Sequence, residues 1–373
     1  MGSMTGSRKL QLCYLAALVA LLSLSSVCAN TQSQEQAKQD YLVWVDKMGK
    51  NFETLPATTS EPAMMDPSYA VSSGPVTINV NPKKGKGDFQ SVQDAVNAVP
   101  DGTTRPYILR ISAGTFKEMV VVKASKGPIT FQGAGMTKTK ITFHLDSAEA
   151  DGTMASSTVM IFSDYFICKD IAFENTSPSP LPGAVGEQAV AFMIQGDKAA
   201  FYRCAFFGFQ DTLYDKQGRH YWKDCYIRGT IDFIFGDGQS YYENCYLDSV
   251  ATTFGSLTAQ KREYKTETSG YSFVNCTVNG TGYSYLGRAW GNYSTVVFID
   301  TYLSSAIRPE GWFDWGVPAR EQTVFYGEYH CYGPGANRAG RPTWSLELSP
   351  TQVKPFLTVD WIQGKTWIPT GPQ

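Results

Sequence analysis

Two aspartates occupy the same position in consecutive copies of one sequence repeat. The copies of the repeat core read FYRC, YWKDC, YYENC and SFVNC, and they end at Cys204, Cys225, Cys245 and Cys276. Cys204 and Cys225 are 21 residues apart, as are Asp211 and Asp232, so each aspartate follows its own cysteine by seven positions. If each repeat is one coil of a solenoid, the two carboxyl groups lie on adjacent coils, roughly 4.8 Å apart.

Two carboxyl groups this close can act on the same atom. Like charges at this separation do not both ionise readily, which raises one pKa and leaves an acid beside a base. Gln188 precedes Gln210 by 22 residues, again about one coil, and the later segment LGRAW supplies Arg288 and Trp290. The spacing therefore predicts an active site with two carboxyls and two amides on one face, and with a cation and a large ring supplied downstream.

Short strand-like runs, separated by glycines, dominate the chain from Val76 onward and must position these side chains. They are Val76–Val80, Tyr107–Ile111, Val120–Val122, Ile129–Gly133, Val159–Phe162, the cysteine repeats, Val296–Leu303 and Thr323–Tyr329. A period near 20 residues with three short strands in each period is typical of a parallel β-helix. A leucine-rich solenoid would need regular leucine and asparagine positions, which are missing. A β-sandwich would not keep cysteine at a constant offset.

The start of this region carries a helical pattern as well. Phe89, Val92, Ala95, Val96 and Val99 recur with helical spacing and end before Pro100. A helix there would cover the exposed edge at the open end of a solenoid. We expect an all-β fold with one short N-terminal capping helix, in which the aromatic positions of successive repeats stack in the core.

The N-terminal segments are interpreted separately from the fold. Arg8 and Lys9 precede an apolar run and then Val27-Cys28-Ala29, which predicts a secretory signal at residues 1–29, with a retained signal anchor as the alternative. Residues 30–75 are polar and end in a proline- and serine-containing linker. Within them, Tyr41, Trp44, Val45 and Met48 fit a short amphipathic helix that could pack on the main body. We expect the catalytic domain at residues 76–373.

The overall charge excludes some kinds of partner. Loss of Arg8 and Lys9 with the signal would take Lys plus Arg from 32 to 30 against 34 acidic residues, for a net charge near −4. This balance argues against nucleic acid, whose binding depends on neutralising many phosphates. It also gives an acidic polymer no long-range attraction, so that recognition of such a polymer would have to be local.

Six cysteines remain after removal of the signal, and two interpretations of them stay open. An exported protein can form disulfides, but four of the cysteines lie in the repeat and suit a ladder of small buried side chains. His144, His220 and His330 are isolated and no C-x-x-C occurs, so no metal site is expected. Asn175, Asn275, Asn279 and Asn292 each begin an N-x-[ST] sequon and are candidates for glycosylation. Neither the G-x-S-x-G elbow of serine hydrolases nor H-E-x-x-H is present.

Five segments together resemble the motif set of the plant pectin methylesterases, or pectinesterases, and they occur in that family's order. They are GTFKE (from Gly114), EQAVA (from Glu187), QDTLY (from Gln210), DFIFG (from Asp232) and LGRAW (from Leu286). The resemblance runs from about Val76 to the C-terminus. It implies a right-handed parallel β-helix and a cofactor-free enzyme that removes methyl esters from galacturonate units of cell-wall pectin.

The resemblance also implies a role for each site residue. Asp232 would be the nucleophile, oriented and kept ionised by Arg288, and Asp211 would be the proton donor and later the base. Gln188 and Gln210 would stabilise the oxyanion. Thr115, Gln188, Arg288 and Trp290 would bind the sugar chain. Tyr214, Phe235 and Trp312 could touch substrate, although packing explains each nearly as well.

The chain departs from the family pattern at two positions and in length. Ala289 stands where proline is more common, which frees the backbone before Trp290. Phe116 stands where tyrosine is frequent. Many members carry an N-terminal inhibitor-like helical domain, for which the 46 residues from Asn30 to Pro75 are too few. We expect a secreted monomer in the plant cell wall that binds pectin, with a proteinaceous pectinesterase inhibitor as a candidate partner and with no nucleic acid or membrane partner.

Two other functions remain open at this stage. Paired carboxylates also suit a glycosidase that cleaves the pectin chain on the same solenoid, and their separation would decide its stereochemistry. The sequence lacks further acidic residues clustered by the pair and supplies amide donors, which favours the esterase. A catalytically silent pectin binder is the third hypothesis.

Overall fold

The computed structural model describes residues 36, 39–46, 74–181 and 184–369, which fall into two compact units divided after Leu55. In the first unit, residues 39–46 are helical, and Tyr41 and Trp44 are its most buried side chains. Met48, the signal segment and most of the linker lie outside the described residues. No helix in the described part of the chain is long and apolar enough to cross a membrane.

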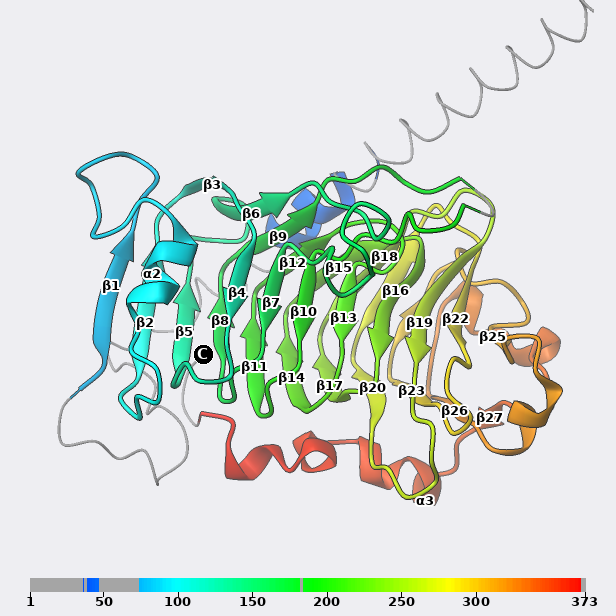
Figure 1. The fold of residues 1–373 in the computed structure, drawn as a ribbon. Helices are drawn as coiled ribbons and strands as arrows, with labels where there is room; N and C mark the ends of the chain where they lie inside the picture. The colour runs from blue at the N-terminus through cyan, green and yellow to red at the C-terminus, as the bar shows by residue number, and fades with distance from the viewer. Residues whose placement is uncertain (1–35, 37–38, 47–73, 182–183, 370–373) are drawn as a thin grey trace, which may run out of the picture. The chain divides into compact units, whose positions relative to one another are not determined.

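The second unit is a parallel β-helix, as the repeat predicted. Its described strands form three parallel sheets that run side by side along the molecule (Figure 1). The first sheet contains β1 (Val76–Val80), β2 (Tyr107–Ile111), β5 (Ile129–Gln132), β8 (Ile167–Lys169), β11 (Ala199–Tyr202), β14 (Arg219–Lys223), β17 (Gln239–Glu243), β20 (Gly270–Val274), β23 (Thr295–Ile299), β26 (Phe325–Tyr329) and β27 (Leu346–Glu347). The second contains β4 (Val120–Val122), β7 (Val159–Ile161), β10 (Phe192–Ile194), β13 (Leu213–Asp215), β16 (Ile231–Gly236), β19 (Gly255–Gln260), β22 (Ser284–Arg288) and β25 (Trp312–Phe313). The third contains β3 (Gly114–Lys117), β6 (Thr139–Phe143), β9 (Ala172–Asn175), β12 (Ala205–Phe207), β15 (Tyr226–Gly229), β18 (Tyr246–Ser249), β21 (Thr277–Gly280) and β24 (Tyr302–Leu303).

Each coil takes one strand from each sheet, and the sharp corner between the first and third sheets explains the repeat. The residue before each repeat cysteine has a left-handed backbone, with φ of 51° at Arg203, 54° at Asp224, 54° at Asn244 and 53° at Asn275. Asn and Asp tolerate this conformation better than most residues, and here it turns the chain within one residue. The same corner at Asp300 (φ 47°) divides the single run expected over Val296–Leu303 into β23 and β24.

The core is built from side chains that repeat from coil to coil. Inward-facing rings of the first sheet stack in register: Phe201 on Trp222 at 3.8 Å between centroids, Trp222 on Tyr242 at 5.6 Å and Tyr242 on Phe273 at 4.4 Å. This confirms the predicted aromatic stacking. All six cysteines in the described residues are free thiols, and five of them are buried, which favours the interpretation as a packed ladder over disulfides.

The predicted capping helix is α2 (Val92–Ala98), which lies beside β1 and β2 at one end of the solenoid (Figure 1). Ser91 caps it by accepting a hydrogen bond from the Asp94 N–H. The carboxylate of Glu118, from the GTFKE segment, accepts the N–H groups of Val92 and Gln93 at 2.8 and 2.9 Å. A carboxylate is stabilising at a helix N-terminus, so Glu118 has a structural role here.

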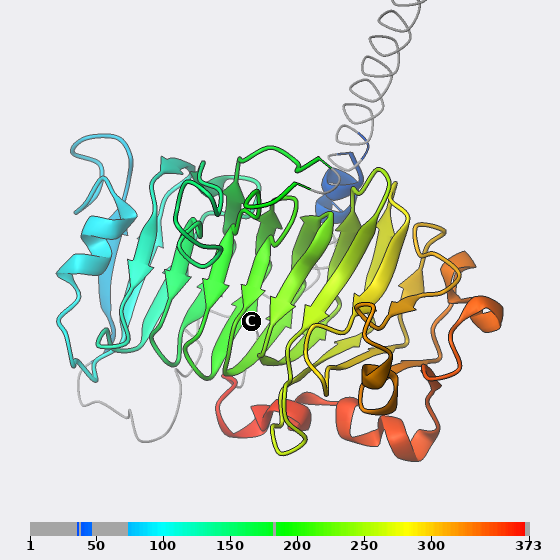
Figure 2. The ribbon, with the colours of Figure 1, turned by 45° about the vertical axis from the view of Figure 1, so that its right-hand side comes forward.

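A chain of short helices after the last strand packs along the first sheet, where both views show it running beside the strands (Figure 2). Ile362 and Trp367 join a buried cluster with Tyr202, Tyr221 and Tyr241. These helices are α3 (Pro350–Val353), η5 (Lys354–Phe356), η6 (Val359–Ile362) and η7 (Gly364–Thr366). Three further short helices come before the last strand: η2 (Pro318–Gln322), η3 (Pro334–Ala336) and η4 (Arg338–Gly340). The repeat carries no signal for them.

Candidate active site

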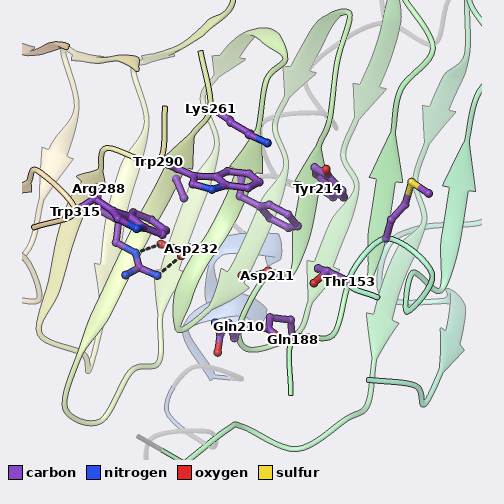
Figure 3. A pocket seen from close by; sticks show the side chains of 13 residues that line it. Thr153, Gln188, Gln210, Asp211, Tyr214, Asp232, Lys261, Arg288, Trp290 and Trp315 are labelled. Carbon is purple, nitrogen blue, oxygen red and sulfur yellow. Dashed lines mark hydrogen bonds and ion pairs between the residues drawn. The ribbon is translucent and has the colours of Figure 1, made fainter. Parts of the chain in front are cut away.

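A pocket of about 440 Å³ opens on the outer face of the second sheet (Figure 3). Six of its lining residues are ones that the sequence placed in the site or the sugar groove: Gln188, Gln210, Asp211, Asp232, Arg288 and Trp290. It is also lined by Thr153, Met154, Tyr214, Phe235, Ala259, Lys261 and Trp315. The structure therefore brings the predicted carboxyl, amide and cationic groups together in one cavity.

The two aspartates lie on adjacent coils, Asp211 two residues before β13 and Asp232 at the second position of β16. These strands pair with Leu213 opposite Ile234, and extending that register by two residues places Asp211 opposite Asp232. The Asp211 N–H donates to the Ile231 carbonyl at 3.0 Å, which holds the two turns together. Both aspartates adopt the left-handed backbone, with φ of 65° and 51°. Such conformations cost about 1–3 kcal/mol and cluster at functional sites.

Arg288, at the end of β22, forms a bidentate ion pair with Asp232. Its Nε donates to Oδ1 at 2.6 Å, and its Nη2 donates to Oδ2 of the same carboxylate. The guanidinium also lies over the ring of Trp315, 3.9 Å from its centroid. The pair fixes the orientation of the Asp232 carboxylate because planar fork-to-fork geometry is specific.

The environment separates the titration of the two aspartates. Burial raises the pKa of Asp211 well above its usual range, and the charge of Asp232 raises it further, with Arg288 acting in the opposite direction. Burial also raises the pKa of Asp232, but hydrogen bonds and charge from Arg288 oppose that rise, as does the Ser256 hydroxyl. Arg288 thus lowers the pKa of Asp232, as predicted, but burial outweighs this effect, so the expectation of a low pKa for Asp232 is wrong. The order of titration remains, with Asp232 losing its proton first.

Gln188 and Gln210 lie side by side at one end of the pocket, next to Asp211 (Figure 3). The Ala189 N–H donates to the Gln210 carbonyl at 3.2 Å, which holds the two segments on adjacent coils. Within the described residues, neither side-chain amide has a hydrogen-bond partner. Each N–H is thus available to a group that enters the cavity.

Aromatic rings form the other side of the pocket. Tyr214 and Phe235 are opposite each other on β13 and β16 and stack at 4.2 Å between centroids, and Trp290 lies 6.2 Å from Phe235. Trp312 is a different case, because it is only 2% exposed and stacks on Tyr326 in the core at 4.5 Å. It does not line the pocket, and Trp315 supplies the additional ring instead.

The structure shows how the chain accommodates its two departures from the family pattern, Ala289 and Phe116. The Ala289 N–H, which a proline would lack, donates to the Phe313 carbonyl at 2.9 Å, so a hydrogen bond holds the backbone before Trp290. Phe116 is buried in the core.

Thr115, its neighbour, is exposed on β3 and does not line the pocket. Three coils, roughly 14 Å at the usual strand spacing, separate β3 from β12, the strand that precedes Asp211. The role of Thr115 in sugar binding stays a prediction.

One glycosylation candidate needs correction. Asn175 is 2% exposed, and its amide nitrogen donates to the carbonyls of Leu145, Ser156 and Val190 at 2.9 to 3.1 Å. A glycan on that nitrogen would remove these bonds, so Asn175 is a core residue and not an acceptor in the folded protein. Asn275 and Asn292 are exposed and Asn279 is half-buried, and all three stay candidates.

Comparison with known proteins identifies relatives over most of the chain. A family model described as pectinesterase matches residues 78–365. The chain is 45% identical over 294 residues to "Probable pectinesterase 8" of Arabidopsis thaliana, covering 77% of this chain and 75% of that protein. It is 39% identical over 372 residues to "Pectinesterase QRT1" of the same organism, covering 93% and 95%.

Solved structures with the same fold include pectin methylesterases with identities above 25%. The pectin methylesterase from carrot superimposes with a TM-score of 0.73 and 33% identity, over 80% of this chain and 96% of that one. The pectin methylesterase from Aspergillus niger in deglycosylated form superimposes with a TM-score of 0.67 and 28% identity, over 82% and 97%.

Proposed function

Because the chain belongs to the pectinesterase family, we propose that it hydrolyses methyl esters of galacturonate units in pectin and releases methanol. The observation that carries the proposal is the pair of aspartates on adjacent coils, one bound to Arg288 and the other without a hydrogen-bond partner for its carboxyl group among the described residues. An ester hydrolase whose nucleophile is a carboxylate needs that group ionised beside a neutral acid, and this environment favours that distribution.

The reaction follows from these positions in two stages. Asp232 attacks the ester carbonyl carbon, and the amides of Gln188 and Gln210 donate hydrogen bonds to the oxyanion that forms. Asp211 gives its proton to the departing methoxy oxygen, so methanol leaves and an acyl-enzyme on Asp232 remains. Asp211, now ionised, then takes a proton from a water molecule that attacks the acyl carbon. The products are the free acid on the sugar, the Asp232 carboxylate and a reprotonated Asp211.

A product assay separates this function from its competitors. Purified protein given methylated pectin is expected to release methanol without producing new reducing ends. A chain-cleaving glycosidase would produce reducing ends instead, and a silent binder would produce neither. Either of those results would overturn the proposal. We further propose that the protein is exported to the cell wall, which is supported by the signal expected at residues 1–29 and by the extracellular location of pectin.

The oxyanion role predicts the effect of amide truncation. Replacing Gln188 or Gln210 singly with alanine should lower kcat about 10²- to 10³-fold, the loss found when one oxyanion donor is removed. KM should change little, because the lost bonds form mainly in the transition state. Gln132→Ala removes an exposed amide on β5, away from the pocket, and should leave kcat unchanged. Equal losses in the three variants would contradict the assignment.

The different protonation states required of the two aspartates predict a bell-shaped pH profile of kcat/KM. At low pH Asp232 becomes protonated and stops being a nucleophile, so activity falls on the acid side. At high pH Asp211 loses the proton it must donate, so activity also falls on the alkaline side. Because burial and the Asp232 charge raise the pKa of Asp211 well above its usual range, the alkaline limb should lie far above an ordinary aspartate pKa. Initial rates of methanol release across pH measure both limbs, and the absence of an alkaline limb would contradict the assignment.

A further inference from the structure

Two cationic side chains line the pocket, and the proposed reaction uses only one of them. Arg288 is committed to Asp232 by its bidentate ion pair. Lys261 is exposed, and among the described residues it has no ion-pair or hydrogen-bond partner for its ammonium group. A positive charge at the wall of a substrate cavity, with no carboxylate paired to it among the described residues, is available for an anion on the substrate.

The fold fixes where Lys261 stands. It directly follows β19, and its backbone N–H donates to the Gly236 carbonyl at 2.8 Å on the preceding coil. Its ammonium lies over the ring of Trp290, 4.6 Å from the centroid. Figure 3 shows Lys261 across the pocket from Gln188 and Gln210, on the far side of the Trp290 ring. A cation–π contact holds the ammonium near a ring that we expect to face a sugar.

A neighbouring acidic group does not cancel this charge by direct contact. Asp237 is next to Lys261 in register, because Gly236 pairs with Gln260, and the two interact electrostatically. However, the Asp237 carboxylate accepts the hydroxyl of Ser269 and lines a different cavity. Lys216, which lies one coil before Asp237 and two before Lys261, donates to Gln195 at 2.8 Å and is already engaged.

We propose that the ammonium of Lys261 binds the carboxylate of an unesterified galacturonate unit close to the unit whose ester is cleaved. The proposal rests on the proposed function and adds a preference to it. A methyl ester is neutral, whereas the product of each turnover is a carboxylate, and an ammonium–carboxylate hydrogen bond is stronger than a neutral one. The negative net charge of the chain supplies no general attraction for an acidic polymer, so this local contact would decide the preference. The enzyme should therefore act faster on pectin that has already lost part of its methyl groups.

The test compares two substrates and four proteins. Methanol release gives kcat/KM for wild type, Lys261→Gln, Lys261→Arg and Lys83→Gln on highly methylated pectin and on the same pectin after partial alkaline de-esterification. Lys261→Gln should lower kcat/KM about fivefold on the partly de-esterified substrate, the size expected of one charge-assisted contact that water still reaches. On the highly methylated substrate the loss should stay below about twofold. Lys261→Arg should retain the preference, and added salt should weaken it in wild type.

Lys83→Gln is the matched control because it removes the same charge from an exposed turn after β1, away from the pocket. It should leave both values unchanged. If Lys261→Gln changes kcat/KM equally on the two substrates, or changes it on neither, Lys261 is only a solvated lysine at the rim of the pocket. The inference is then overturned. If wild type releases no methanol from either pectin, it is the proposed function that fails.

Discussion

Replacing Asp232 with asparagine is expected to lower kcat for methanol release by roughly 10⁴- to 10⁶-fold, as removal of a catalytic nucleophile does in other hydrolases. Asparagine keeps the size of the side chain but cannot attack as a carboxylate. The backbone should tolerate the change, because Asn244 and Asn275 adopt the same left-handed conformation elsewhere in the chain, with φ of 54° and 53°. The measurement is single-turnover methanol release with purified protein.

Asp224→Asn provides the matched control for this variant. Asp224 is 5% exposed, as Asp232 is, and also has a left-handed backbone, but it lies at a corner of the solenoid and does not line the pocket. It should keep kcat within about threefold of wild type, the range of a modest local perturbation. An Asp232→Asn protein that folds normally and retains full activity would refute the nucleophile assignment.

The second large effect is expected for Asp211→Asn, which should lower kcat about 10²- to 10⁴-fold, the usual contribution of a general acid–base group. The loss should be smaller than that for Asp232→Asn, because methanol can still leave with a proton from water. Moreover, the alkaline limb of the kcat/KM profile should disappear, since the group whose deprotonation causes it is absent.

The pH profile separates a catalytic role of Asp211 from a merely structural one. A variant that is only destabilised would lose activity evenly and keep the alkaline limb. Asp300→Asn changes an exposed aspartate in the same left-handed conformation (φ 47°), outside the pocket, and should keep the wild-type profile. Retention of the alkaline limb in Asp211→Asn would show that another group donates the proton.

The part of the fold and site that follows the repeat could be predicted from the sequence. Asp211 and Asp232 share an offset because their strands pair in register with coils of 21 residues. The same regularity predicted the stacked core rings and the clustering of Gln188 with Gln210. Capping by α2 could be predicted from its apolar spacing, since a helix placed there covers a sheet edge.

The residues that sequence reasoning missed lie where the regular spacing fails. Lys261 follows a longer coil, in which Phe235 pairs with Ala259 at a separation of 24 residues, so counting by 21 does not reach it. Trp315 lies in a loop after β25, beyond the LGRAW segment, and only the folded chain brings it over Arg288. Asn175 reads as a surface sequon, but its burial depends on three carbonyls from distant segments.

In the active enzyme Asp232 should be ionised while Asp211 is protonated, and infrared difference spectroscopy distinguishes these two states of a carboxyl group. Spectra of wild type minus each Asp→Asn variant should be recorded at the pH of greatest activity. Subtracting Asp211→Asn should reveal the band of a protonated carboxyl, and subtracting Asp232→Asn should reveal the bands of a carboxylate. Two carboxylates, or the reverse assignment, would contradict the mechanism.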